Sequence, residues 1–270
     1  MTAYPTTTTR AGPDLPADRC VRVVRTMGTV ISIDVRAPET PKLRRALEAA
    51  ESLLHDADAV FSTYRDDSWI SRLARRAVRP RDLPPPVPEV FALCAEVEHL
   101  TDGWFTARWR GDGSLDPTGV VKGWAAERAS RLLTATGFGS HCVNAAGDLA
   151  LAGRPAAGRV WRIGISDPRE DGALLGVVEA PAGGAFAVAT SGVAERGRHI
   201  LDPRTGRPAE AVLSATVAGP VLSLADGLAT ALVAAGPAAP ALLRRWREAG
   251  WSGCLLTAAG GLVDPDGLLG

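Results

Sequence analysis

The chain has 270 residues, 46% of them hydrophobic, which allows a sizeable core in one large domain or two small ones. Its 30 Lys and Arg balance its 30 Asp and Glu, so no long-range field favours nucleic acid or an anionic membrane as a partner. The four cysteines lack the paired spacing of a zinc or redox site, which is typical of reduced thiols in a cytoplasmic protein.

The N-terminal segment, Met1 to Asp18, is rich in Thr and Pro and holds no apolar run. A signal peptide or a membrane anchor needs such a run, so we expect neither of them. We expect residues 1–18 to form a disordered tail and residues 19–270 to form one folded domain. We also expect no contact with a membrane or with nucleic acid.

The first predicted elements are two strands and a long helix. Alternating apolar residues between Val21 and Arg36, broken at Met27-Gly28-Thr29, predict strands joined by a hairpin or a bulge. Thr40 followed by Pro41 is a typical helix start. Apolar residues at spacings of three and four then predict one amphipathic helix that ends near Phe61.

Proline and glycine mark the boundaries of the next elements. The stretch from Pro80 to Pro88 breaks regular structure, and a second helix is predicted from about Pro88 to Leu100. Asp102-Gly103 ends that helix. A third helix is predicted from about Val121 to Gly137, where the glycine closes it.

The second half of the chain contains grouped strands followed by helices. Strands are predicted at 141–151, 161–166, 186–190, 215–218 and 254–257, and helices at 222–235 and 238–248. Because the strands occur in neighbouring groups and do not alternate strictly with helices, we expect an α+β fold with mostly antiparallel sheet and packed helices.

The helix predicted at 222–235 carries the first candidate site. Asp226 and Thr230 are four residues apart, so a carboxylate and a hydroxyl lie on one helix face, where such hard oxygen ligands suit Mg²⁺. The alternative interpretation is structural: Ser223 and Asp226 also match a helix capping box, with Thr230 solvated.

A second candidate site follows the strand predicted at 186–190. Ser191-Gly192 offers backbone amides and a hydroxyl to a phosphate, and Asp202 to Gly206 is a strong turn signal. His199, just before that turn, is a candidate for proton transfer or phosphate binding. A structural histidine is the alternative.

Two further segments carry polar groups at turns. In Asp116 to Trp124, a loop with Gly119 leads into a helix that we expect to open near Lys122, and its amides and dipole favour an anion. The spacing differs from a P-loop, so it does not indicate nucleoside triphosphate hydrolysis. Asn144 to Asp148 supplies amide and carboxylate groups that suit the polar edge of a ligand, or is an ordinary turn.

The order of several short motifs is more specific than any one of them. They are Met27-Gly28-Thr29, Phe61-Ser62-Thr63-Tyr64, Lys122-Gly123-Trp124-Ala125, Asn144 to Asp148, Ala189 to Gly192, His199 to Gly206 and Ala225 to Thr230. Together they make the chain similar, from about Met27 to Asp264, to the ApbE family of FAD:protein FMN transferases. The resemblance implies a two-layer α+β fold related to the T-fold, with FAD in a cleft.

The resemblance also implies roles for individual residues. Asp226 and Thr230 would bind Mg²⁺ together with a backbone carbonyl of Gly119 or of its neighbour Thr118. The residues that would contact the flavin cofactor are Met27, Tyr64, Lys122, Asn144, Asp148, Ser191, Gly192 and His199. The chain departs from the family at Ala146, where relatives usually have glycine, and at Glu127, where relatives often have Asp.

The reaction implied by the resemblance is the transfer of FMN from FAD to a threonine of an acceptor protein, with release of AMP. His199 and Asp226 are both candidates for the base, and the sequence does not choose between them. A magnesium-dependent FAD pyrophosphatase and a non-catalytic flavin-binding protein are the alternative functions. We expect the acceptor to be a cytoplasmic protein.

Overall fold

The computed structural model describes residues 18–111, 113–192 and 200–270, and thus Asp18 alone of the expected tail. The strands are β1 (Cys20–Thr26), β2 (Thr29–Val35), β3 (His141–Ala145), β4 (Asp148–Ala152), β5 (Arg162–Ser166), β6 (Leu174–Glu179), β7 (Ala185–Gly192), β8 (Leu201–Asp202), β9 (Arg207–Pro208), β10 (Val212–Gly219), β11 (Ser252–Thr257) and β12 (Leu262–Val263). The α-helices are α1 (Pro41–Phe61), α2 (Trp69–Ala74), α3 (Pro86–Leu100), α4 (Thr118–Ala135), α5 (Leu222–Ala235) and α6 (Ala239–Trp246).

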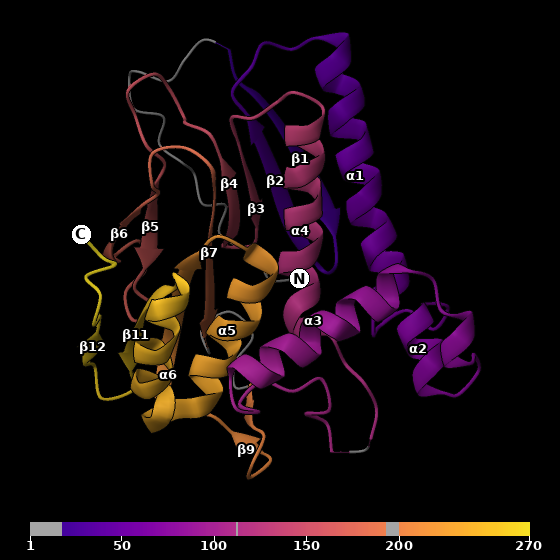
Figure 1. Cartoon of the computed structure of the whole chain (residues 1–270), viewed down its shortest axis with the longest axis vertical. Helices are drawn as coiled ribbons and strands as arrows, with labels where there is room; N and C mark the ends of the chain where they lie inside the picture. Colours follow the sequence, from indigo (N-terminus) through magenta and orange to yellow (C-terminus); the bar gives the residue numbers. More distant parts are fainter. Residues whose placement is uncertain (1–17, 112, 193–199) are drawn as a thin grey trace.

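One sheet organises the described chain. Its eight strands follow the order β1-β2-β3-β4-β7-β10-β11-β12, and every neighbouring pair is antiparallel. Helices α1, α4, α5 and α6 lie in front of this sheet, and α3 crosses the ends of α4 and α5 (Figure 1). The predicted α+β class with mostly antiparallel sheet is confirmed.

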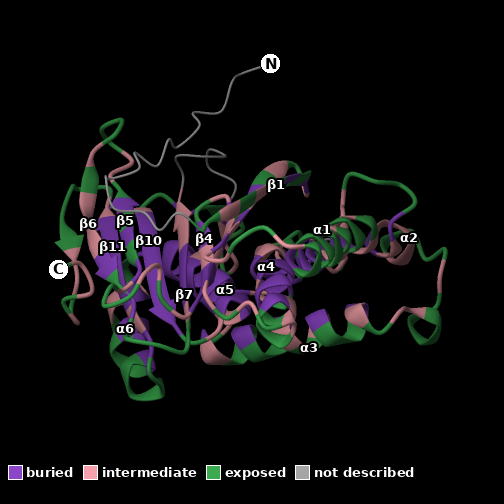
Figure 2. Cartoon of the chain, turned by 90° about the horizontal axis from the view of Figure 1, so that it is seen from above, coloured by how far each residue is buried: buried purple, intermediate pink, exposed green. Residues whose placement is uncertain are grey.

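Each face of the sheet buries a separate apolar cluster. On the helix side, Val143, Ala145 and Val217 belong to the large core that α1, α4 and α5 complete. Successive strand residues point to opposite faces, so Leu151 and Val188 belong to a smaller cluster beneath the β5-β6 hairpin. Figure 2 shows that the central strands and the inner sides of the helices are buried.

The first hairpin and the first helix form as predicted. Met27 and Gly28 connect β1 to β2 with positive φ angles of 50° and 68°, as a tight hairpin turn requires. Thr40 caps α1, because its side chain accepts a hydrogen bond from the Leu43 N–H at 3.1 Å. Phe61, at the end of α1, packs edge-on against the Trp124 ring at 5.4 Å between centroids.

Several boundaries differ from the sequence prediction. The run 141–151 is two strands, β3 and β4, joined at Ala146-Gly147, and neither α2 nor β6 was predicted. Helix α4 begins at Thr118, not near Lys122, because the Asp116 carboxylate accepts the Thr118 N–H at 3.0 Å and thereby starts the helix earlier. Lys122 therefore lies inside α4.

One stretch of the described chain, Leu222–Ala249, is long and apolar enough to span a membrane by length and composition alone. It consists of α5, α6 and the short turns beside them, and 78% of its apolar window is buried inside the structure. Helix α5 packs against α4, β7 and β10, so its apolar character is explained by its place in the core.

The four cysteines are free thiols. Burial raises the pKa of Cys94, Cys142 and Cys254 to about 12. These three thiols are therefore protonated at neutral pH, which makes them poor nucleophiles and poor metal ligands.

A buried histidine joins α4 to the start of β3. His141 is 0% exposed, its Nδ1 lies 2.7 Å from the Phe138 carbonyl oxygen, and its Nε2 lies 2.7 Å from Ser130 Oγ. Burial lowers the pKa of His141 below its usual value of 6.5. The folded protein therefore holds this histidine neutral at a pH where the unfolded chain already binds a proton.

We expect the free energy of unfolding to decrease as the pH falls below about 6.5, because protonation of His141 then favours the unfolded chain. One such histidine contributes a slope of up to about 1.4 kcal/mol per pH unit until its folded pKa is reached. Urea titrations between pH 5 and pH 7 measure this slope. It should be smaller in His141→Gln but not in the exposed control His55→Gln; equal slopes in wild type and His141→Gln would disprove the assignment.

Candidate active site

A cavity of about 340 Å³ opens where helices α4 and α5 meet the ends of strands β7 and β10. Its lining comes from segments far apart in sequence: Trp104–Thr106, Trp109, Asp116, Thr118, Gly119, Lys122, Ala146, Gly147, Ser166, Pro168, Thr190–Gly192, Ile200, Leu201, Pro203, Leu213, Ser214, Asp226, Thr230 and Ala234. The cavity is thus the point at which all four candidate segments from the sequence converge.

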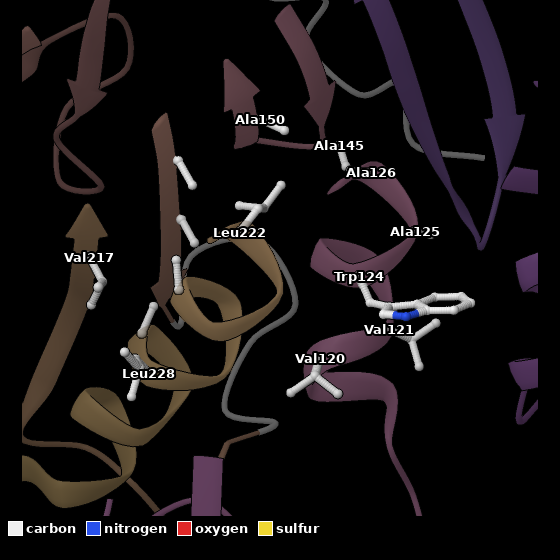
Figure 3. Packing of buried hydrophobic residues seen from close by; sticks show 14 of the residues in the cluster. Val120, Val121, Trp124, Ala125, Ala126, Ala145, Ala150, Val217, Leu222 and Leu228 are labelled. Carbon is white, nitrogen blue, oxygen red and sulfur yellow. The ribbon is translucent and has the colours of Figure 1, made fainter. Parts of the chain in front are cut away.

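The two helices beside the cavity approach each other at a glycine. The Gly123 N–H on α4 donates a buried hydrogen bond of 2.9 Å to Asp226 Oδ2 on α5. A Cβ on Gly123 would lie 2.7 Å from the Leu222 carbonyl oxygen and 2.9 Å from the Asp226 Cβ, so no larger residue fits without a shift of the helices. Figure 3 shows buried apolar residues that both helices contribute to the core, among them Val120 and Trp124 of α4 and Leu222 and Leu228 of α5.

Asp226 and Thr230 face the cavity from α5, as their spacing predicts. Asp226 is only 5% exposed, and Thr230 Oγ1 lies 3.1 Å from Ser191 Oγ of β7. A carboxylate and a hydroxyl on one wall are hard oxygen donors of the kind that Mg²⁺ prefers. Gly119, the third predicted ligand, lines the same cavity.

The donor set fits a metal that is shared with a substrate. Within the parts of the chain that the structure describes, no group of three or more His, Cys, Asp and Glu side chains is placed to hold a metal ion by itself. A single carboxylate with a hydroxyl and a carbonyl leaves several positions on Mg²⁺ for water and phosphate oxygens. The residues present therefore suit Mg²⁺ bound together with a phosphate-bearing ligand.

The alternative interpretation of Ser223 and Asp226 as a capping box is wrong. The N-cap residue of α5 is Val221, which makes no side-chain cap bond, so Ser223 lies within the first turn. Its N–H and hydroxyl both donate to Glu127 on α4. The Asp226 carboxylate is directed to Gly123, not to its own helix terminus.

Lys122 of α4 forms an ion pair that links this helix to the sheet. Its Nζ lies 2.5 Å from Oδ2 of Asp148, which is 1% exposed at the start of β4. The other Asp148 oxygen accepts the Thr190 N–H of β7 at 3.0 Å. Lys122 lines the cavity and Asp148 lies behind it, so Asp148 acts on the cavity through Lys122 and through the strand that carries Ser191.

Three more of the predicted cofactor contacts, Ser191, Gly192 and Asn144, lie at the cavity or shape a turn that lines it. Ser191 and Gly192 line the cavity at the end of β7. Asn144 is not among the lining residues; its Oδ1 accepts the Gly147 N–H at 2.8 Å and thereby shapes the β3-β4 turn, whose Ala146 and Gly147 do line the cavity. Ala146 adopts a left-handed φ of 51°, which is unusual for a residue other than glycine.

Two predicted cofactor contacts lie away from the cavity, and one candidate cannot be placed. Met27 is in the turn between β1 and β2, and Tyr64, after α1, is 97% exposed; neither lines the cavity. His199 is outside the residues that the structure describes. The residues that follow it, Ile200 and Leu201, line the cavity.

The sequence reasoning missed Asp116 as a structural anchor of the cavity. This carboxylate is 3% exposed; Oδ1 accepts the Thr118 N–H at 3.0 Å and its hydroxyl at 2.6 Å, and Oδ2 accepts two bonds from Arg110. The Asp-Pro-Thr pattern before a helix was the available signal. An aspartate side chain typically accepts a hydrogen bond from the backbone N–H two residues later.

An aromatic wall was also missed. Trp104, Phe105 and Trp109 line the cavity from the segment between α3 and α4, and the Arg204 guanidinium stacks on Trp104 at 3.8 Å from the ring centroid. Three aromatic residues in six positions are a signal in a chain with 5% aromatic residues. This wall offers flat apolar surface for a ring system.

A further part of the lining comes from the end of β5 and the β5-β6 connection, through Ser166 and Pro168. The turn is closed by the Asp167 N–H, which donates to the Ala173 carbonyl at 2.9 Å, and by Arg169, which binds the Asp167 carboxylate. The Arg169 side chain lowers the pKa of Asp167 to about 2. The carboxylate therefore remains ionised, and paired with Arg169, through the whole neutral range.

Comparison with known sequences identifies one family. A sequence model described as the ApbE family matches residues 27–112 and 106–251. A Vibrio cholerae protein named FAD:protein FMN transferase is 28% identical over 84% of this chain and 84% of its own length. Proteins of the same name from Salmonella typhimurium and Rhodobacter capsulatus are 33% and 38% identical over 45% of this chain, which is 37% and 24% of their own lengths.

Solved structures share the fold. The ApbE protein of Thermotoga maritima matches with a TM-score of 0.77 at 22% identity, over 92% of this chain and 97% of that one. The flavin transferase ApbE of Vibrio cholerae matches with a TM-score of 0.75 at 23% identity, over 92% and 97%. These similarities confirm the fold over most of both chains.

The close approach at Gly123 leads to a prediction. Gly123→Ala should lower the free energy of unfolding by about 1–3 kcal/mol, because the new methyl group would lie against the Leu222 carbonyl and force α4 and α5 apart. The matched control is Gly139→Ala, where an added Cβ meets nothing within 4 Å. Urea unfolding measures both variants, and equal stability of the two would contradict the close contact.

Proposed function

Because this chain belongs to the ApbE family, we propose that it transfers FMN from FAD to another protein, with Mg²⁺ as its cofactor. It is an enzyme of the transferase class, as its relatives are named. The single observation that carries the proposal is that Asp226, Thr230 and Gly119 line one cavity together with Lys122 and Ser191. This set combines hard oxygen donors for a metal with a cation and amides for phosphate.

In the proposed site, Asp226, Thr230 and the Gly119 carbonyl would hold Mg²⁺, which when bound would offset negative charge on the phosphate oxygens of FAD. Lys122 supplies a fixed positive charge beside the same phosphates, and Asp148 orients it. Ser191 and Gly192 approach FAD through the main chain, and the turn shaped by Asn144 borders it. We also propose that Met27, Tyr64 and His199 contact FAD.

The proposed reaction exchanges one phosphorus–oxygen bond for another. The hydroxyl oxygen of an acceptor threonine bonds to the FMN-side phosphorus, and the bond from that phosphorus to the AMP phosphate oxygen breaks. AMP leaves, and the hydroxyl proton passes to a base of the enzyme. His199 and Asp226 are both candidates, and the hydrogen bond from Gly123 fixes the orientation of the Asp226 carboxylate.

The proposed function predicts which products appear under which conditions. Purified protein incubated with FAD and Mg²⁺ should release AMP only when an acceptor with a target threonine is present, and the acceptor mass should increase by one FMN. Chromatography of the nucleotides and mass spectrometry of the acceptor measure both. AMP without acceptor would show an FAD pyrophosphatase, and bound flavin without AMP would show a flavin-binding protein.

Loss of the negative charge on Asp226 of α5 should slow the transfer strongly. Asp226→Asn keeps an oxygen that can accept the Gly123 N–H but removes the charge, so we expect a fall in rate of at least about 100-fold with little loss of stability. The transfer rate over a series of Mg²⁺ concentrations measures the effect. The control is Asp171→Asn at an exposed position, and a variant at 226 with the wild-type rate would refute the assigned role.

A further inference from the structure

The N-terminus of α5 lacks a cap from its own segment. The N-cap residue is Val221, with no side-chain cap bond. The first backbone N–H groups of a helix have no acceptor within the helix, and Ser223 carries one of them. Because Ser223 is 7% exposed, water has little access to its polar groups, so they need a partner from elsewhere in the protein.

That partner is a carboxylate on another helix. Glu127 Oε2, on α4, accepts the Ser223 N–H at 2.9 Å and the Ser223 hydroxyl at 2.7 Å. The Glu127 side chain is 12% exposed, and its other oxygen pairs with Arg131 one turn further along α4. Its negative charge lies at the positive end of the α5 dipole, which stabilises this arrangement.

The same two helices are therefore joined by two polar contacts. Glu127 lies one turn after Gly123 on α4, and Ser223 lies nearly one turn before Asp226 on α5. Apolar packing against β7 and β10 already holds α5 in the core, and a single polar contact to α4 adds one fixed point. Two contacts at different heights also fix the rotation of α5, on which the direction of Asp226 and Thr230 depends.

We propose that Glu127 is a positioning residue for the metal-binding face of α5, acting through Ser223. Glu127 is not among the residues that line the cavity, so any influence on the metal passes through the rotation of α5. The role rests on the proposed magnesium-dependent function.

The test is direct metal binding, with Mn²⁺ as the probe for the Mg²⁺ site, on the full chain with saturating FAD and without acceptor protein. Glu127→Ala should weaken Mn²⁺ binding by about 10-fold, as removal of a group that orients a metal ligand typically does. Glu127→Gln keeps an acceptor oxygen and should weaken binding less. The double variant Glu127→Ala with Ser223→Ala should bind no more weakly than Glu127→Ala alone, because both changes remove the same contact.

The matched control is Ser130→Ala, which removes a buried hydrogen bond from the same helix on the side of His141. It should lose stability in urea but keep the wild-type affinity for Mn²⁺, which separates positioning from general destabilisation.

If wild type binds Mn²⁺ and Glu127→Ala binds equally well, the positioning role is overturned and the proposed function is not. If wild type binds no Mn²⁺, the metal-dependent function fails as well. Should Glu127→Ala not fold, Ser223→Ala tests the same contact and is expected to weaken binding.

Discussion

The hydrogen bond from the Gly123 N–H to the Asp226 carboxylate is the interaction on which the rest of the site depends. It forms only because the absence of a side chain at Gly123 lets α5 approach the backbone of α4. The contact removes the Asp226 carboxylate from water but leaves it beside the cavity. Burial of a carboxylate costs free energy unless the carboxylate accepts hydrogen bonds. The hydrogen bond from the Gly123 amide offsets part of this cost and also fixes the orientation of Asp226.

Two other buried carboxylates near the cavity are also held by hydrogen-bond donors. Asp148 uses one oxygen for Lys122 and the other for the Thr190 amide, and Asp116 uses one for Arg110 and the other for Thr118. Each carboxylate thus holds both a cation and a backbone amide. Such pairs are weak evidence for stability, because their desolvation offsets much of their attraction. Their stronger effect is geometric, since each one fixes a segment that lines the cavity.

Local patterns predicted much of this fold. The Thr40 cap and the apolar spacing gave α1, and the spacing of Asp226 and Thr230 placed both on one face of α5. Features that depend on distant partners were not predictable. The partners Glu127 and Ser223 are 96 residues apart, and no local pattern indicates that a carboxylate in one helix caps another. The six-residue helix α2 was missed because it is too short to show a period.

The β5-β6 hairpin has a consequence for how such proteins diverge. It forms its own two-stranded sheet, yet its connection supplies Ser166 and Pro168 to the cavity wall. Insertions or substitutions there would reshape one side of the cavity without moving the crossing of α4 and α5. A lineage can therefore alter which molecule enters while it conserves the chemistry, and sequence change in this hairpin is the place to look for altered selectivity among homologues.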